Sequence, residues 1–191
     1  EKCKALILRG IFLLRKFEID WFYQQGCSMI YPDEWENYKS VIPKQEQNNF
    51  VKAYYKRLTS KNKNIRLKAA TAWSKWEAST SKLVQKKKSL HHFDNPKIAE
   101  AFARIECHYF INNAFFNTDN WILKNINKIQ HIPGAIIQGR YDVVCPMQSA
   151  WDLHKKLNHF EFYIINKAGH SMLEKDIQAQ LIECTNRFIK Y

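Results

Sequence analysis

The sequence predicts an α/β fold, in which parallel strands are flanked by helices and a large all-helical insertion follows the first strand. Short apolar blocks bounded by turn residues occur at 4–9, 133–139 and 160–165. Between the first two blocks, from about residue 14 to 123, the apolar residues follow a helical period. After residue 133, strand and helix alternate, which is the order typical of a parallel sheet.

Several helices can be placed within the insertion. Pro32 is positioned to open one helix, and Asn95 and Pro96 are positioned to cap and begin another. A third helix is expected over residues 64–83, and the loop after it, 85–93, is rich in Lys and His. One more helix is indicated by an apolar stripe that consists of Val51, Tyr54, Tyr55 and Leu58.

The last part of the chain should return to the sheet. A helix is expected over residues 146–157, between the two C-terminal strands. Ser171 and Glu174 have the spacing of a capping box, so they predict the start of a last helix that runs toward Ile189. The predicted domains are a core strand at 1–14, a helical cap at 15–124 and the rest of the core at 125–191.

The chain is strongly basic, with 30 Lys and Arg against 18 Asp and Glu and a net charge of +12. An excess of this kind can indicate nucleic-acid binding. However, the one compact basic cluster is Lys86–Lys88, and the sequence has no zinc-finger, RNP or basic-zipper pattern. We therefore interpret the basic residues as solvated helix faces and expect no nucleic-acid partner. The oligomeric state stays open.

The spacing of the cysteines and histidines bears on whether the protein binds a metal ion and on its redox compartment. The five cysteines are never spaced as CxxC, and the seven histidines include no HExxH motif. This pattern suits a reducing compartment and predicts neither a metal site nor a cofactor. No apolar run approaches the roughly 18 residues of a membrane span. We therefore expect a cytoplasmic protein without a membrane partner.

Two titratable residues follow the two C-terminal strands. Asp142 ends the string GRYD after the first strand, and His170 lies in AGHS after the second. Because open α/β sheets bind ligands at the carboxyl ends of their strands, we expect these side chains to meet. A buried carboxylate that fixes the tautomer of an imidazole allows its other nitrogen to take a proton from a serine. Either residue alone would more often be an ordinary loop residue, whereas their joint placement favours a catalytic pair.

Six sequence blocks, which span nearly the whole chain in the family's order, resemble those of the bacterial proline iminopeptidases. The blocks are LRGIF at 8–12, WSKWE at 73–77, ARIECHYF at 103–110, HIP at 131–133, GRYD at 139–142 and AGHS at 168–171. The last two are common among hydrolases, whereas the first three are much more specific. The resemblance implies the C-terminal part of an α/β-hydrolase with a large all-helical cap insertion. It also implies a serine peptidase that releases N-terminal proline from small peptides through an acyl-enzyme.

The same resemblance implies that Glu77 and Glu106 bind the free amino end of the substrate. On helical spacing alone, each glutamate shares a helix face with aromatic residues. A carboxylate in such surroundings is costly unless a cation pairs with it. A protonated imino group is one such cation. Arg9 or Arg104 would serve equally well, so the residues by themselves leave both interpretations open.

The resemblance further implies that Asp142 is the orienting acid and His170 the general base. It places Phe12, Phe110 and Cys145 around the proline ring, with Arg9 near the amino end. Without the resemblance, ordinary core packing would be the preferred interpretation of the two phenylalanines. Phe22 stands where the family carries tyrosine, which would remove a hydroxyl near the substrate.

No serine of the chain lies in a GxSxG string, and the family's nucleophile and oxyanion loop lie upstream of the first strand. We therefore expect a missing N-terminal segment of the same protein to supply both, and the chain alone to be inactive. Two alternatives stay open. One is another capped α/β-hydrolase, such as an esterase or an epoxide hydrolase. The other is a non-catalytic hydrolase remnant that serves as an interaction module, which a continuous basic face would support.

Overall fold

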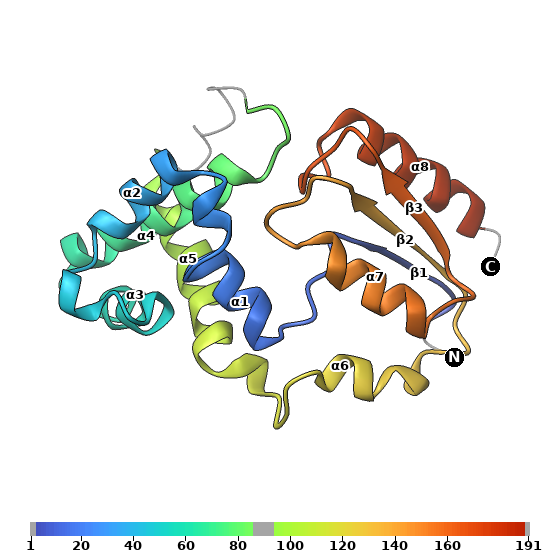
Figure 1. Ribbon diagram of the computed structural model, residues 1–191, viewed down its shortest axis with the longest axis horizontal. Coiled ribbons are helices and arrows are strands. Elements are labelled where there is room, and N and C mark those ends of the chain that lie inside the picture. The colour runs from blue at the N-terminus through green and yellow to red at the C-terminus, as the bar shows by residue number, and fades with distance from the viewer. Residues whose placement is uncertain (1–2, 86–93, 190–191) are drawn as a thin grey trace. The chain divides into compact units, whose positions relative to one another are not determined.

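The computed structural model describes residues 3–85 and 94–189. The Lys86–Lys88 cluster and most of the expected loop at 85–93 lie outside these residues. The chain divides into two compact units (Figure 1). The sheet unit comprises Glu1–Leu13, Ser81–Leu83 and Asn120–Tyr191, and the helical unit comprises Leu14–Thr80 and Val84–Asp119.

The sheet unit contains three parallel strands in the order β1-β2-β3, with bounds Leu6–Arg9, Gly134–Gly139 and Glu161–Ile165. In the register of the sheet, Leu8 lies opposite Ile136, which in turn lies opposite Phe162. Helix α7, Met147–Lys156, connects β2 to β3, and helix α8, Lys175–Phe188, follows β3. The predicted parallel alternation of strand and helix is confirmed.

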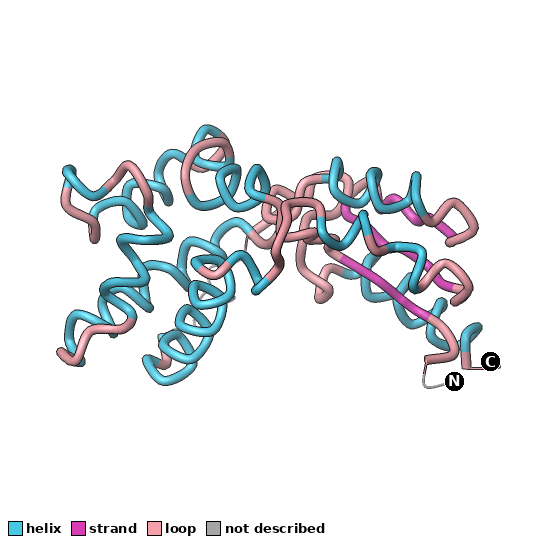
Figure 2. The backbone as a smooth tube through the Cα atoms, turned by 90° about the horizontal axis from the view of Figure 1, so that it is seen from below, coloured by secondary structure: helices cyan, strands magenta, loops and turns pink. Residues whose placement is uncertain are grey.

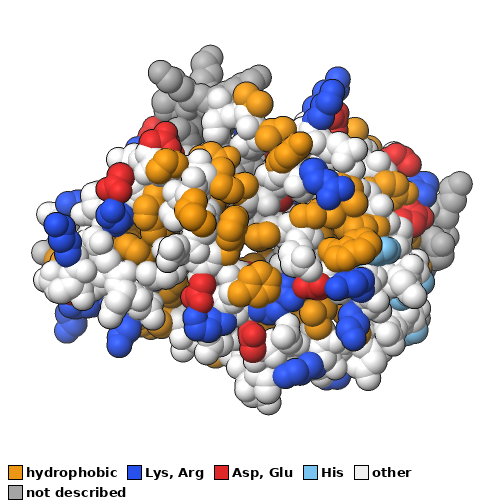
Figure 3. Space-filling view, viewed as in Figure 1, with side chains coloured by type: hydrophobic (Ala, Val, Ile, Leu, Met, Phe, Trp, Pro, Cys, Tyr) orange, Lys and Arg blue, Asp and Glu red, His pale blue; other side chains and the backbone are white. Residues whose placement is uncertain are grey.

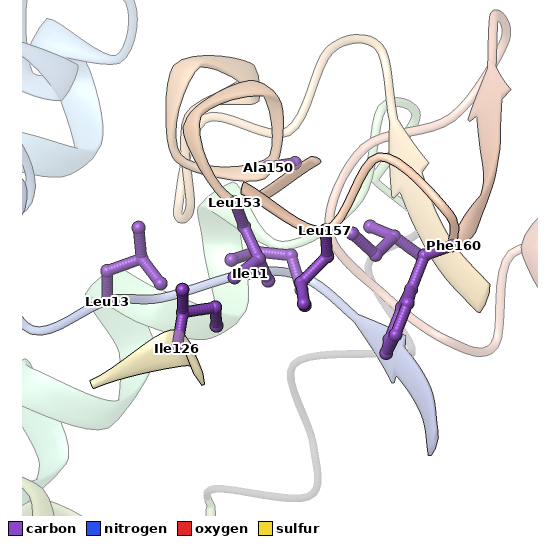
Figure 4. Packing of buried hydrophobic residues seen from close by; sticks show 8 residues of the cluster. Ile11, Leu13, Ile126, Ala150, Leu153, Leu157 and Phe160 are labelled. Carbon is purple, nitrogen blue, oxygen red and sulfur yellow. The ribbon is translucent and has the colours of Figure 1, made fainter. Parts of the chain in front are cut away.

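Both faces of the central strand are covered, which explains why β2 is buried at every position. Ile136 points to one face and packs with Leu153 of α7 and with Leu157, the residue that follows this helix, in the cluster that Figure 4 draws. Ala135 and Ile137 point to the other face and pack with α8. Because α7 covers one face of β2 and α8 covers the other, apolar residues in the block at 133–139 follow one another without alternating with polar ones.

The helical unit consists of helices and connecting turns, whereas all three strands lie in the sheet unit (Figure 2). Its main helices are α1 Lys16–Tyr23, α2 Pro32–Ser40, α3 Phe50–Leu58, α4 Lys63–Thr80 and α5 Pro96–Ile111. Shorter helical elements of the chain are η1 Cys27–Met29, η2 Lys44–Glu46, η4 Asn113–Phe115, α6 Trp121–Lys124 and η5 Ile126–Lys128. Aromatic rings fill the core of this unit; Tyr38 and Tyr54, for example, stack with their centroids 4.5 Å apart.

Most of the helix predictions are confirmed. Pro32 begins α2, and the Asn95 side chain caps α5 by accepting a hydrogen bond from the backbone N–H of Lys97 at 3.0 Å. The expected stripe on α3 is right in part, because Tyr54 and Leu58 are buried whereas Val51 and Tyr55 are partly exposed.

The predicted capping box at Ser171 and Glu174 is wrong. Helix α8 begins at Lys175, and no side chain caps its first turn. The Glu174 carboxylate instead accepts hydrogen bonds from the backbone N–H groups of Gly169 at 2.9 Å and Leu83 at 3.2 Å. The glutamate therefore connects the loop that carries His170 to the segment that follows α4.

The apolar character of the helices and the distribution of charge on the surface bear on membrane insertion and on nucleic-acid binding. Within residues 3–85 and 94–189, no helix has the length and apolar character needed to span a bilayer. On the face that Figure 3 draws, Lys and Arg side chains are scattered among apolar and neutral ones and do not gather in one patch.

Candidate active site

Asp142 and His170 meet at the carboxyl ends of β2 and β3. His170 Nδ1 lies 2.9 Å from Asp142 Oδ2, and Asp142 is 5% exposed. The other carboxylate oxygen accepts hydrogen bonds from the backbone N–H groups of Val144 at 3.1 Å and Cys145 at 2.8 Å. Because the carboxylate can only accept, the proton of neutral His170 belongs on Nδ1, and Nε2 is left as a proton acceptor.

Glycines allow the loops of this pair to approach closely. A Cβ on Gly139 would lie 1.9 Å from the carbonyl oxygen of Gly169, so only glycine fits where the two loops cross. The backbone N–H of Tyr141 donates to the carbonyl of Ala168 at 3.0 Å, which joins the loops directly. Gly10 has φ +52°, and a Cβ there would lie 2.9 Å from His170 Cε1. The His170 ring therefore packs against the backbone of Gly10, which has no side chain.

Arg9 also contacts His170 within the sheet unit. Its Nη2 lies 2.7 Å from the carbonyl oxygen of His170, 3.0 Å from the ring nitrogen Nε2 and 3.2 Å from Nδ1. Because Nη2 is nearly equidistant from the two ring nitrogens, the guanidinium lies against the imidazole, and its directed hydrogen bond is the one to the carbonyl oxygen of His170. The role near the substrate's amino end that the resemblance implies for Arg9 stays a prediction.

The helical unit contains a second cluster of titratable groups, formed by Glu77 of α4 and Glu106 of α5, both of which are partly exposed. The indole N–H of Trp73 donates to Glu106 Oε2 at 2.9 Å, and the hydroxyl of Tyr23 donates to Glu77 Oε2 at 3.1 Å. Arg104, one of the arginines considered as a partner, pairs with Glu100 at 3.4 Å.

Electrostatics make this carboxyl pair favour a proton. Burial raises the pKa of Glu106 well above its ordinary value, and the negative charge of Glu77 and a hydrogen bond to it raise the pKa further. Hydrogen bonds from Trp73 and Tyr23 oppose this shift but do not reverse it. A cation bound beside the two carboxyls would reduce their repulsion and favour the ionised form of both.

Tyr23 is a site residue that the sequence did not reveal. Burial, followed by the charges of Glu106 and Glu77, raises its pKa well above the ordinary value, so the phenol keeps its proton and acts as a donor. Phe22 next to it is buried, with its ring 5.4 Å from that of Trp76. The loss of a hydroxyl near the substrate that was expected at Phe22 stays a prediction.

The remaining predicted residues lie in both units. The Phe110 ring lies 5.2 Å from that of Tyr23, and the two line an open cavity of about 840 Å³ within the helical unit. In the sheet unit, Phe12 is partly buried, and Cys145 is buried and contacts Asp142 through its backbone. A common role around a proline ring stays a prediction. In the part of the chain that the structure describes, no group of three His, Cys, Asp or Glu could hold a metal ion.

Comparison with known proteins bears directly on this arrangement. A protein of Leptolyngbya boryana named "Probable proline iminopeptidase" is 54% identical over 189 residues, which are 99% of this chain and 59% of that protein. The proline iminopeptidase of Arabidopsis thaliana is 50% identical over 183 residues, which are 95% of this chain and 48% of that protein. The chain is homologous to the proline iminopeptidases. The family resemblance predicted from the sequence blocks is therefore confirmed.

The proline iminopeptidase relatives are longer than this chain. One from Xylella fastidiosa is 46% identical over 189 residues, and the chain spans 60% of its length. No protein-family model matches the chain. A solved structure of an esterase from Exiguobacterium antarcticum aligns with this chain with a TM-score of 0.48 and 12% identity. The alignment covers 97% of this chain and 57% of the esterase chain.

Proposed function

We propose that the protein to which this sequence belongs is a proline iminopeptidase of the α/β-hydrolase type, which releases N-terminal proline from small peptides. The observation that carries the proposal is the contacting pair Glu77 and Glu106, because the raised pKa of Glu106 marks a place that gains from binding a cation. Homology to proteins named proline iminopeptidase supports a protonated proline nitrogen as that cation.

The proposed chemistry uses Asp142 and His170 for proton transfer. A serine from a part of the protein outside this sequence attacks the proline carbonyl carbon, and His170 Nε2 takes the hydroxyl proton. Asp142 holds Nδ1–H and stabilises the imidazolium that forms. The C–N bond then breaks, and His170 gives the proton to the leaving amine. A water molecule next attacks the acyl-enzyme; His170 takes a proton from this water and returns it to the serine oxygen as the ester bond breaks.

The carboxyl pair would supply selectivity for a free amino end. A protonated proline nitrogen carries two N–H donors, which Glu77 and Glu106 can accept once both are ionised. Binding of this cation should therefore lower the raised pKa of Glu106. An N-acylated proline has no such charge and would leave the carboxyl pair without a partner, at a cost in affinity.

The test compares hydrolysis of proline β-naphthylamide and of its N-acetyl derivative by the whole protein. We expect the free form alone to be cleaved, and Glu106→Gln to lower kcat/KM by about 30-fold or more, as expected for a lost partner in a largely desolvated charge pair. Glu46→Gln is the matched control, because that carboxylate of the helical unit binds Lys56 and Arg57 and should be neutral to activity.

Two results would contradict the proposal. Equal cleavage of the blocked substrate would show that no amino end is recognised. Hydrolysis of p-nitrophenyl acetate without any cleavage of the proline substrate would instead favour an esterase, with Glu106 as a structural residue.

A further inference from the structure

Gln138 is a buried polar residue in an otherwise apolar strand. It lies near the end of β2, is 0% exposed, and makes three hydrogen bonds through its amide. Its Nε2 donates to Asp142 Oδ2 at 3.0 Å and to the carbonyl of Cys145 at 2.9 Å, while its Oε1 accepts from the backbone N–H of Ile11 at 3.0 Å. Since both N–H groups and the oxygen are used, the orientation of the amide is fixed by its partners.

The contact with Asp142 is made at the oxygen that serves the imidazole. Asp142 Oδ2 accepts from both Gln138 and His170, whereas Oδ1 accepts from two backbone N–H groups. Gln138 therefore holds the carboxylate in the orientation in which Oδ2 faces His170.

The third hydrogen bond connects this carboxylate to the backbone on which His170 rests. Ile11 follows Gly10, whose bare Cα faces the His170 ring. By holding the N–H of Ile11, the Gln138 amide fixes the turn after β1 relative to Asp142. One side chain thus sets the position of two of the groups that surround the imidazole.

We propose that Gln138 is a positioning residue for proton transfer by Asp142 and His170, an inference that rests on the proposed function. Because Gln138 is fully buried and acts through Asp142, its loss should lower kcat and leave KM nearly unchanged. By analogy with partners that orient the ligands of metal sites, we expect a loss of roughly 10- to 100-fold.

The test uses two variants in the whole protein. Gln138→Met keeps the length of the side chain but removes every hydrogen bond, so its kcat should be low at every pH. Gln138→Glu can donate to Asp142 while the new carboxyl is protonated, and it opposes Asp142 once ionised. The ratio of its kcat to that of the wild type should therefore fall as the pH rises.

Ile136→Val is the matched control, since Ile136 is buried on the same strand and packs against Leu153 of α7. It should lower the melting temperature without altering the pH profile. The ratio of kcat values is measured per folded molecule. If this ratio does not change with pH for Gln138→Glu, the inference is overturned and Gln138 has only a structural role. A wild-type protein that cleaves no proline substrate would instead overturn the proposed function, and activity on p-nitrophenyl acetate would still allow the variants to be compared.

Discussion

Replacing Glu106 with glutamine should stabilise the protein at neutral pH. In the folded helical unit, burial and the charge of Glu77 raise the pKa of Glu106 well above its ordinary value. Ionising this carboxyl therefore costs free energy in the folded state that it does not cost in the unfolded chain. Glutamine has nearly the same shape as a protonated glutamate and carries no charge, so it avoids the cost while it can still accept a hydrogen bond from Trp73.

The sign of the pH dependence follows from the direction of the shift. An unfolded glutamate loses its proton at about pH 4.3, so above that pH the folded protein holds one more proton than the unfolded chain. The free energy of unfolding should therefore fall as the pH rises, up to the raised pKa of Glu106. For one proton the slope is at most about 1.4 kcal/mol per pH unit. In Glu106→Gln this contribution should vanish.

The assay is urea unfolding of the whole protein at several pH values between about 5 and 8, a range above the ordinary pKa of glutamate. Fluorescence of the buried Trp73 and Trp76 reports on the helical unit. Glu46→Gln is the control: hydrogen bonds from Lys56 and Arg57 lower the pKa of Glu46, so its contribution is lost as the pH falls below its ordinary range. Between pH 5 and 8 (roughly) it should therefore keep the wild-type slope. Equal slopes for wild type and Glu106→Gln would refute the reasoning.

Two further predictions concern the groups around His170. Gly10→Ala forces a side chain onto a residue with φ +52° and against the imidazole, so it should lower the free energy of unfolding by at least about 1–2 kcal/mol and reduce kcat; unchanged urea unfolding would argue against this packing. Glu174→Gln leaves the N–H of Gly169 or Leu83 without its acceptor, so it should cost about 1 kcal/mol and speed hydrogen exchange at that amide. Exchange rates equal to those of the wild type at both amides would contradict the assigned role of Glu174.

The strands and the pairing of Asp142 with His170 could be predicted because both depend on local pattern. Apolar blocks between turn residues marked the strands, and the helices between them required a parallel sheet. Parallel strands end at one edge, so residues that follow two neighbouring strands come together. The helices of the insertion were equally readable, since Pro32, Asn95 and Pro96 act within one turn of the chain.

The sequence by itself therefore determined the α/β class, the helical insertion, the similarity to the proline iminopeptidases and the two residues at the strand ends. The tertiary structure alone decided which side chains hold the titratable groups. Tyr23 reaches Glu77 across 54 positions, and Ile11 reaches Gln138 across 127. Glu174, which local spacing assigned to a helix cap, bonds Leu83 across 91 positions instead. The physical reason is that periodicity shows which face of an element is buried, whereas the partner on that face depends on how distant elements pack.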